Sequence, residues 1–101
     1  MPFYLKDKYY RVMASIFKIS RGDRHSIHWN DFVHTMKALG YAYSNDKGSK
    51  RTFKPRRVEL KHDFKSREPK EGQLEPYRQD DMAPKLTAKL GWTASSFKLK
   101  E

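Results

Sequence analysis

The sequence of 101 residues contains no cysteine, so disulfide bonds and metal sites built on thiolates are excluded. It also has no run of about 18 apolar residues, the length that a membrane-spanning helix needs. The N-terminal stretch MPFYLKDKYYRV carries charges at Lys6, Asp7 and Lys8, which excludes the apolar region of a signal peptide. We therefore expect an intracellular protein, cytoplasmic or nuclear, that has no membrane as its partner.

Acidic residues are scarce. The chain has 12 Asp and Glu against 22 Lys and Arg, which gives a net charge of +10 and a pI of about 9.9. A basic domain of this size is typical of nucleic-acid binding, and acidic proteins and anionic membranes are the competing partners. Residues 46–70 hold 10 of the Lys and Arg against four acids, so they supply +6 of the net charge. Such a charge run can also be a solvated face that binds nothing.

Apolar residues make up only 37% of the chain, which is low for a globular protein. Aromatic residues account for 14% and compensate because each buries a large area. We therefore predict a single domain over residues 1–101 with a modest core.

Apolar spacing predicts two helices in the first 40 residues. The first covers residues 4–19, with one apolar stripe made of Leu5, Tyr9, Val12, Met13 and Ile16. A turn-rich connector that includes Gly22 follows. The second helix begins at His28 or Trp29 and ends at Gly40, which caps it in the left-handed conformation. Its predicted core face consists of Trp29, Phe32, Val33, Met36 and Leu39.

The hydrophobic period changes to two after Gly40, which predicts strands. Tyr41 and Tyr43 share one face of the first strand, and a turn at residues 45–48 leads into a second strand at about 49–54. There Phe53 faces the core while Lys50, Thr52 and Lys54 face away. A third strand at 57–62 is predicted to point Val58, Leu60 and His62 inward and Arg57, Glu59 and Lys61 outward.

The remaining residues are predicted to form a long loop and a last helix. The loop covers residues 65–79. Asp81 is the predicted N-cap of the helix, which places Pro84 in the first turn, where proline is tolerated. Met82, Leu86 and Leu90 form its apolar stripe, and Gly91 ends it. Trp92 and Phe97 are then expected to fold back on the core.

The predicted order is α-α-β-β-β-α, an α+β fold in which helices cover one face of a three-stranded antiparallel sheet. The other face is left to solvent. Strand alternation gathers Lys50, Lys54, Arg57 and Lys61 on this open face, with Lys47 at the hairpin tip.

Several short motifs resemble the HicA-like family of small RNA-acting toxins, whose fold is like that of the double-stranded-RNA-binding domain. The first motifs are Trp29-Asn30-Asp31-Phe32-Val33 and Met36-Lys37-Ala38-Leu39-Gly40-Tyr41, followed by Lys47-Gly48-Ser49 and Phe53. Leu90-Gly91-Trp92 and Phe97 bring the match nearest to a eukaryotic, mostly fungal branch. The resemblance covers residues 28–97, so the helix at 4–19 lies outside the HicA-like core.

The resemblance implies RNA as the partner, double-stranded RNA included, and a histidine directly after Gly-Ser as the catalytic residue for RNA cleavage. This chain has Lys50 at that position. A lysine cannot transfer protons near neutral pH unless burial lowers its pKa by several units, so ribonuclease activity stays an open question. The catalytic residue is therefore unknown, with Lys50 as the family position and His62 as the fallback.

The expected function is RNA binding through a cationic sheet face. The residues assigned to it are Lys47, Lys50, Arg51, Lys54, Arg56, Arg57, Lys61, Lys65 and Arg67. The alternative is a protein-interaction module whose basic face binds an acidic partner. A membrane-surface binder ranks last, because no basic amphipathic helix is evident.

No cofactor is expected. No metal site is expected either, because His25, His28 and His34 with Asp31 lack the spacing of metal ligands.

Overall fold

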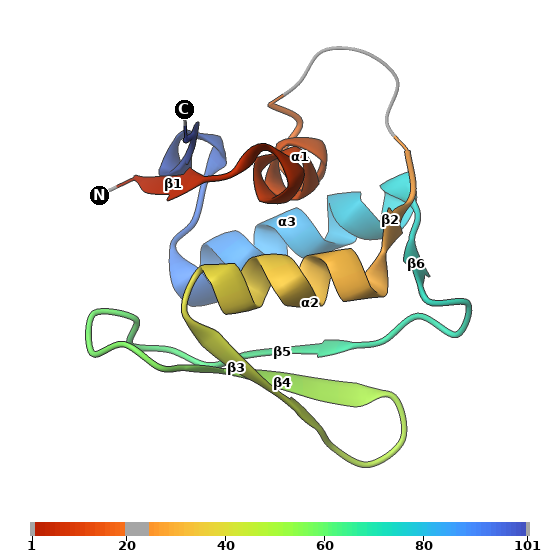
Figure 1. Cartoon of the computed structure of the whole chain (residues 1–101). Helices are drawn as coiled ribbons and strands as arrows, with labels where there is room; N and C mark the ends of the chain where they lie inside the picture. Colours follow the sequence, from red (N-terminus) through yellow and green to blue (C-terminus); the bar gives the residue numbers. More distant parts are fainter. Residues whose placement is uncertain (1, 20–24, 101) are drawn as a thin grey trace.

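The three segments with predicted apolar stripes contain α-helices, and these helices lie on one side of a three-stranded antiparallel sheet (Figure 1). This computed structural model describes residues 2–19 and 25–100. The elements follow in the order β1 (Phe3–Leu5), α1 (Asp7–Ile16), β2 (Ile27–His28), α2 (Trp29–Ala38), β3 (Tyr41–Asn45), β4 (Lys50–Pro55), β5 (Phe64–Arg67), β6 (Gln73–Leu74), α3 (Pro76–Leu90), η1 (Ala94–Ser96) and β7 (Phe97–Leu99). The predicted α+β class and the three-stranded antiparallel sheet are confirmed.

The main sheet has the order β3-β4-β5, with both pairs antiparallel. Its register places Tyr43 opposite Phe53 and Phe53 opposite Phe64, so three aromatic side chains lie in a row on the face that the helices cover. Two short pairs complete the fold, β1 with β7 in parallel and β2 with β6 antiparallel. The β1–β7 pair lies on the far side of the helices from the main sheet (Figure 1).

Two aromatic clusters form the core. In the first, the ring of Phe53 lies 5.1–6.3 Å from the rings of Trp29, Phe32, Tyr43 and Phe64. The second gathers around Trp92, whose ring lies 5.5–5.9 Å from those of Phe3, Tyr41 and Phe97. The predicted return of Trp92 and Phe97 to the core is confirmed, since both are buried.

The predicted helix at 4–19 begins too early. Residues 3–5 instead form β1, which pairs with residues 97–99 at the other end of the chain, and the helix covers Asp7–Ile16. Its apolar side packs as predicted, with Val12, Met13 and Ile16 buried. The predicted turn around Gly22 lies outside the described residues.

The third strand was predicted in the wrong place. Residues 57–62 form no strand, Val58 is 94% exposed, and His62 is exposed rather than inward-facing. The strand next to β4 is β5, at residues 64–67, because Phe64 buries a larger side chain against Phe53 than Val58 could. Residues 56–63 are a loop that turns where the N–H of Leu60 donates to the carbonyl of Arg57.

The predicted loop at 65–79 is also wrong, because it contains most of β5, all of β6 and the start of α3. This helix begins at Pro76 rather than after Asp81, since proline at the first helical position loses no helical hydrogen bond. Pro84 consequently lies in the helix interior, where it removes one backbone hydrogen bond. The stripe is right: Met82 and Leu86 are buried and Gly91 caps the helix at φ 73°.

No helix among the described residues is long and apolar enough to cross a bilayer.

Candidate nucleic-acid interface

Four cations from two neighbouring strands point away from the helices. Strand alternation puts Phe53 and Phe64 on the covered face, so Lys50 and Lys54 of β4 and Lys65 and Arg67 of β5 lie on the outer face. Lys50 is directly opposite Arg67, and all four side chains are exposed. We call these four residues the cationic face; Lys65 and Arg67 take the places that the wrong strand prediction had given to Arg57 and Lys61.

The residues of the cationic face form no ion pair with an acidic side chain of the described residues. None of its four residues has a carboxylate within 4 Å anywhere in residues 2–19 and 25–100. One acid, Asp46, reaches the outer face and accepts a hydrogen bond from Thr52 Oγ1. Thr52 lies in the central strand and points outward as predicted, but it is only 3% exposed. Adjacent strands are roughly 5 Å apart, so four cations in this space repel one another and favour an anionic ligand.

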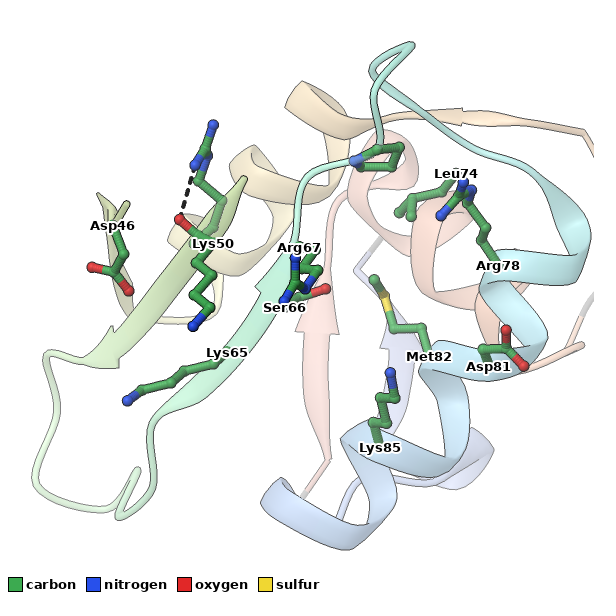
Figure 2. A pocket seen from close by; sticks show the side chains of 12 residues that line it. Asp46, Lys50, Lys65, Ser66, Arg67, Leu74, Arg78, Asp81, Met82 and Lys85 are labelled. Atoms are coloured by element: carbon green, nitrogen blue, oxygen red, sulfur yellow. Dashed lines mark hydrogen bonds between the residues drawn. The ribbon is translucent and has the colours of Figure 1, made fainter. Parts of the chain in front are cut away.

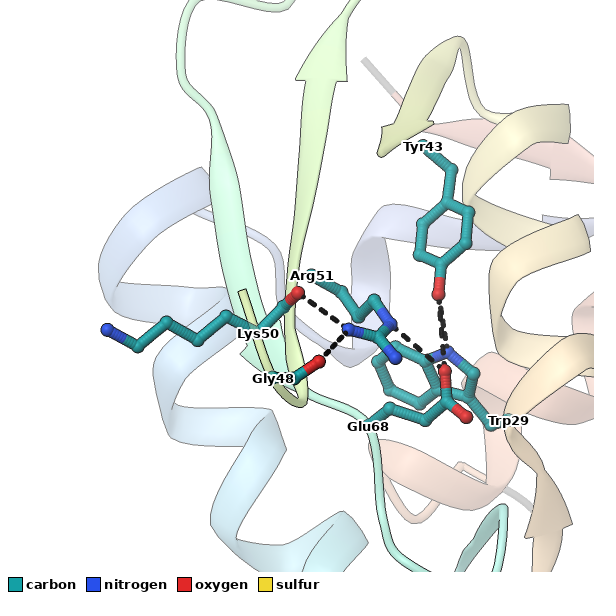
Figure 3. A network of polar contacts seen from close by, with 6 residues as sticks. All are labelled: Trp29, Tyr43, Gly48, Lys50, Arg51 and Glu68. Carbon is teal, nitrogen blue, oxygen red and sulfur yellow. Dashed lines mark hydrogen bonds and ion pairs between the residues drawn. The ribbon is translucent and has the colours of Figure 1, made fainter. Parts of the chain in front are cut away.

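Arg51 was predicted to bind nucleic acid, but the structure places it on the helix-facing side of β4 in a network of polar contacts (Figure 3). Its Nε lies 3.0 Å from Glu68 Oε1, and its Nη1 donates to the carbonyls of Gly48 and Lys50 at 2.8 Å. Burial opposes the charged form, but the hydrogen bond and charge of Glu68 outweigh it, so the pKa of Arg51 is raised. Arg51 therefore stabilises the turn of the β3–β4 hairpin and is not free to bind nucleic acid.

The same network extends to the core. Trp29 Nε1 donates to the hydroxyl of Tyr43 at 3.0 Å, and this hydroxyl donates to Glu68 Oε1 at 3.4 Å (Figure 3). The side chain of Arg51 is 15% exposed and that of Glu68 is 35% exposed, so the pair is partly shielded from water. The chain following β5 is thereby held against the β3–β4 hairpin, which keeps the cationic face in register.

The other predicted binding residues lie around the sheet rather than on its outer face. Lys47 is exposed at the hairpin turn, as expected. Arg56, Arg57 and Lys61 are exposed in the loop at 56–63, and the side chain of Arg57 lies over Gly40 at the end of α2. This loop joins the end of β4 to the start of β5, so its cations lie beyond the ends of the strands, where only a long ligand could contact them together with the cationic face.

A groove runs between β5 and α3 (Figure 2). Its volume is about 690 Å³, and α3 contributes Arg78, Met82 and Lys85 to its lining. Arg78 and Lys85 were not predicted as functional residues, since the last helix was expected to begin only after Asp81, which left Arg78 in a loop and not on one helix face with Lys85. The spacing of 78, 82 and 85 by four and three residues would have placed them on one helix face.

The two candidate catalytic residues do not converge. Lys50 lies opposite Arg67 at the C-terminal end of β5, whereas His62 precedes the other end of this strand. Phe64 and Arg67 alone are separated by about 10 Å along the strand, so Lys50 and His62 are too far apart to act on one phosphate. In the described part of the chain, no three His, Asp or Glu side chains lie close enough to hold a metal ion.

Comparison of the chain with protein-family models, with curated proteins and with solved structures finds no match. The structure alone shows the architecture, in which helices lie on one face of a three-stranded antiparallel sheet. The likeness to HicA-like proteins stays a prediction from the sequence motifs.

Proposed function

We propose that this protein binds RNA through the cationic face, as a HicA-like domain would. The observation that carries the proposal is the set of four exposed cations on two adjacent strands, without carboxylate partners among the described residues. A net charge of +10 attracts polyanions over a distance, and the cationic face gives them a place to bind.

Double-stranded RNA is the preferred form of the ligand. The outer face carries Ala42, Ser44 and Thr52 between its cations and no large side chain that could reach into a groove or stack on a base. Such a surface contacts phosphates without reading bases, and recognition of an A-form duplex depends mostly on shape and backbone. We therefore expect little sequence preference.

Binding without cleavage is the form of the proposal that the site supports best. The family position for the catalytic histidine holds Lys50, which is exposed. Because His62 lies at the opposite end of β5, it does not replace the missing histidine. Lys50 is therefore assigned a phosphate-binding role.

The test compares two double charge reversals that change the net charge equally. Lys50→Glu with Lys54→Glu removes half of the cationic face. Lys6→Glu with Lys98→Glu is the control, because both residues are exposed and adjoin the β1–β7 pair on the far side of the helices. The affinity for a short RNA duplex is measured by fluorescence anisotropy at several salt concentrations.

Each phosphate that is neutralised adds roughly −0.9 to the slope of log affinity against log salt for duplex DNA, so four contacts predict a slope of about −3 to −4. The Lys50/Lys54 variant should lose most of its affinity and about half of this slope, and the control should stay close to wild type. Equal losses in the two variants would mean diffuse electrostatic binding, and the proposal would fall.

A further inference from the structure

Strand β5 is an edge strand with one unpaired side. It pairs with β4 and with no other strand in the described part of the chain. The N–H of Glu68 donates to the carbonyl of Ser49, directly beyond the Lys50–Arg67 pair of the register. Backbone bonds alternate along an antiparallel pair, so Phe64 and Ser66 bond to β4, while the N–H and C=O of Lys65 and Arg67 point away from it. These four backbone groups form the free edge of β5.

The groove between β5 and α3 lies along this free edge (Figure 2). The consecutive residues Lys65, Ser66 and Arg67 line one side of it, and residues of α3 line the other. Its apolar lining residues include Leu74 and Met82, which are 2% and 5% exposed and so offer a small apolar surface. The backbone groups that lack a partner therefore open onto a space with an apolar surface, where an added strand could bury side chains.

The sides of the groove are positive. The lining of the groove includes Lys65 and Arg67 from β5 and Arg78 and Lys85 from α3, and none of these four has a carboxylate within 4 Å among the described residues. Arg78 lies over the ring of Tyr77 at 5.4 Å, and two acids, Asp46 and Asp81, also line the groove. With Lys50 counted, five such cations outnumber these two acids, so the groove favours a negatively charged occupant.

We infer that the free edge of β5 binds an extended acidic segment of a partner protein, which adds to the sheet as a further strand. The N–H and C=O groups of Lys65 and Arg67 make up to four backbone hydrogen bonds to it. Side chains of the added strand alternate. Those on the outer face are acidic and lie beside Lys65 and Arg67, whereas those that point into the groove are apolar and contact Leu74 and Met82.

A peptide fits this edge better than a nucleic-acid strand does. The edge presents two carbonyl groups, which repel phosphate oxygens but accept hydrogen bonds from peptide N–H groups. The residues that line the groove include no aromatic side chain on which a base could stack. The inference goes beyond RNA binding and does not depend on it.

Amide hydrogen exchange tests the geometry directly. In the protein alone, the amides of Phe64 and Ser66 should exchange slowly and those of Lys65 and Arg67 quickly. A capped peptide of about seven residues that alternates Glu and Val should slow exchange at Lys65 and Arg67 by about tenfold or more at saturation. The control peptide has the same sequence but is N-methylated at alternate residues, so it keeps its charge and loses the backbone N–H donors of those residues. It should bind at least about tenfold more weakly.

Protein variants separate this site from the cationic face. Arg78→Glu with Lys85→Glu replaces two cations of the groove lining by acids, which repel the acidic peptide as a whole, so peptide binding should weaken by about tenfold or more. Affinity for duplex RNA should change far less than it does in Lys50→Glu with Lys54→Glu. Both α3 side chains are exposed, so thermal melting should show that the variant is folded.

Three outcomes would overturn the inference. Equal binding of the N-methylated peptide would show attraction by charge alone. Protection of Lys65 and Arg67 by single-stranded RNA but not by peptide would assign the groove to nucleic acid. Absence of peptide binding with RNA binding intact would leave the edge cations as protection against aggregation. Peptide binding with the expected protection but without any RNA binding would support the inference and refute the proposed function.

Discussion

Replacing Phe53 by alanine is expected to remove a large part of the stability of this protein. The Phe53 side chain is fully buried at 0% exposure, and its ring meets four others. Truncation of a buried phenylalanine costs about 3–5 kcal/mol, from lost burial and from the cavity that remains. Domains of this size have a free energy of unfolding of about 5–15 kcal/mol, so the loss is between about a fifth and all of it.

The assay is guanidinium denaturation followed by the fluorescence of Trp29 and Trp92, with circular dichroism as a second probe. Trp29 belongs to the Phe53 cluster and Trp92 to the other one, so coincident transitions would show that the two clusters unfold together. At about 4–8 °C per kcal/mol, the melting temperature should fall by about 12–40 °C.

The matched control is Tyr77→Ala, which also removes an aromatic ring but from a side chain that is 56% exposed. Its cost should stay within about 0.5 kcal/mol. A loss below about 1 kcal/mol for Phe53→Ala, with an unchanged denaturant slope, would refute the assignment of Phe53 to the centre of the core.

Three further outcomes are expected. Gly40→Ala should cost about 1–3 kcal/mol in urea denaturation, and more than Gly91→Ala, because Gly40 has φ 106° and a Cβ there would lie 3.0 Å from Leu60 Cδ1, whereas a Cβ at Gly91 meets nothing within 4 Å. Burial and the charge of Asp63 raise the pKa of Tyr41, so folding favours its neutral form; stability should fall as the pH rises above about 10, and less so in Tyr41→Phe. Purified protein should leave RNA uncut; cleavage that survives Lys50→Ala and is lost in His62→Ala would move the site to the loop at 56–63.

Local signals made α2 and the hairpin predictable. Trp29, Phe32 and Met36 repeat at helical spacing, and Gly40 ends the helix where the period changes to two. Tyr41 and Tyr43 then share the covered face as predicted. Each of these features depends on residues close together in the sequence, where spacing alone decides which side chains meet.

Pairings between distant residues were not predictable in the same way. Residues 3–5 form a strand only because residues 97–99 lie beside them, and their apolar spacing also fits the start of a helix. Residues 57–62 alternate as well as β5 does, and the competition was decided by Phe64, which lies opposite Phe53. The buried Gln79 was not predicted either. It donates hydrogen bonds to the carbonyls of Leu74 and His25, and no sequence pattern indicates such a role.

A basic outer face was predicted and is present, although the third strand was predicted in the wrong place, and the reason is physical. Cations stand at alternate or near-alternate positions both in residues 57–61 and in residues 65–67, so either strand would have placed two of them on the outer face. Charge alternation therefore predicted that a basic face exists without determining which residues form it. That choice depended on the aromatic pair of Phe53 and Phe64 across the strands.

The two proposed ligands share part of one surface, because Lys65 and Arg67 belong both to the cationic face and to the free edge of β5. An acidic strand added to β5 would place its outward carboxylates beside these two residues, roughly 5 Å away across the strands. Only Lys50 and Lys54 would then remain uncompensated on the outer face. Since each phosphate contact contributes to affinity through counterion release, halving the number of available cations weakens RNA binding steeply. On the two proposals together, RNA and the acidic strand bind in competition, although each contacts residues that the other does not.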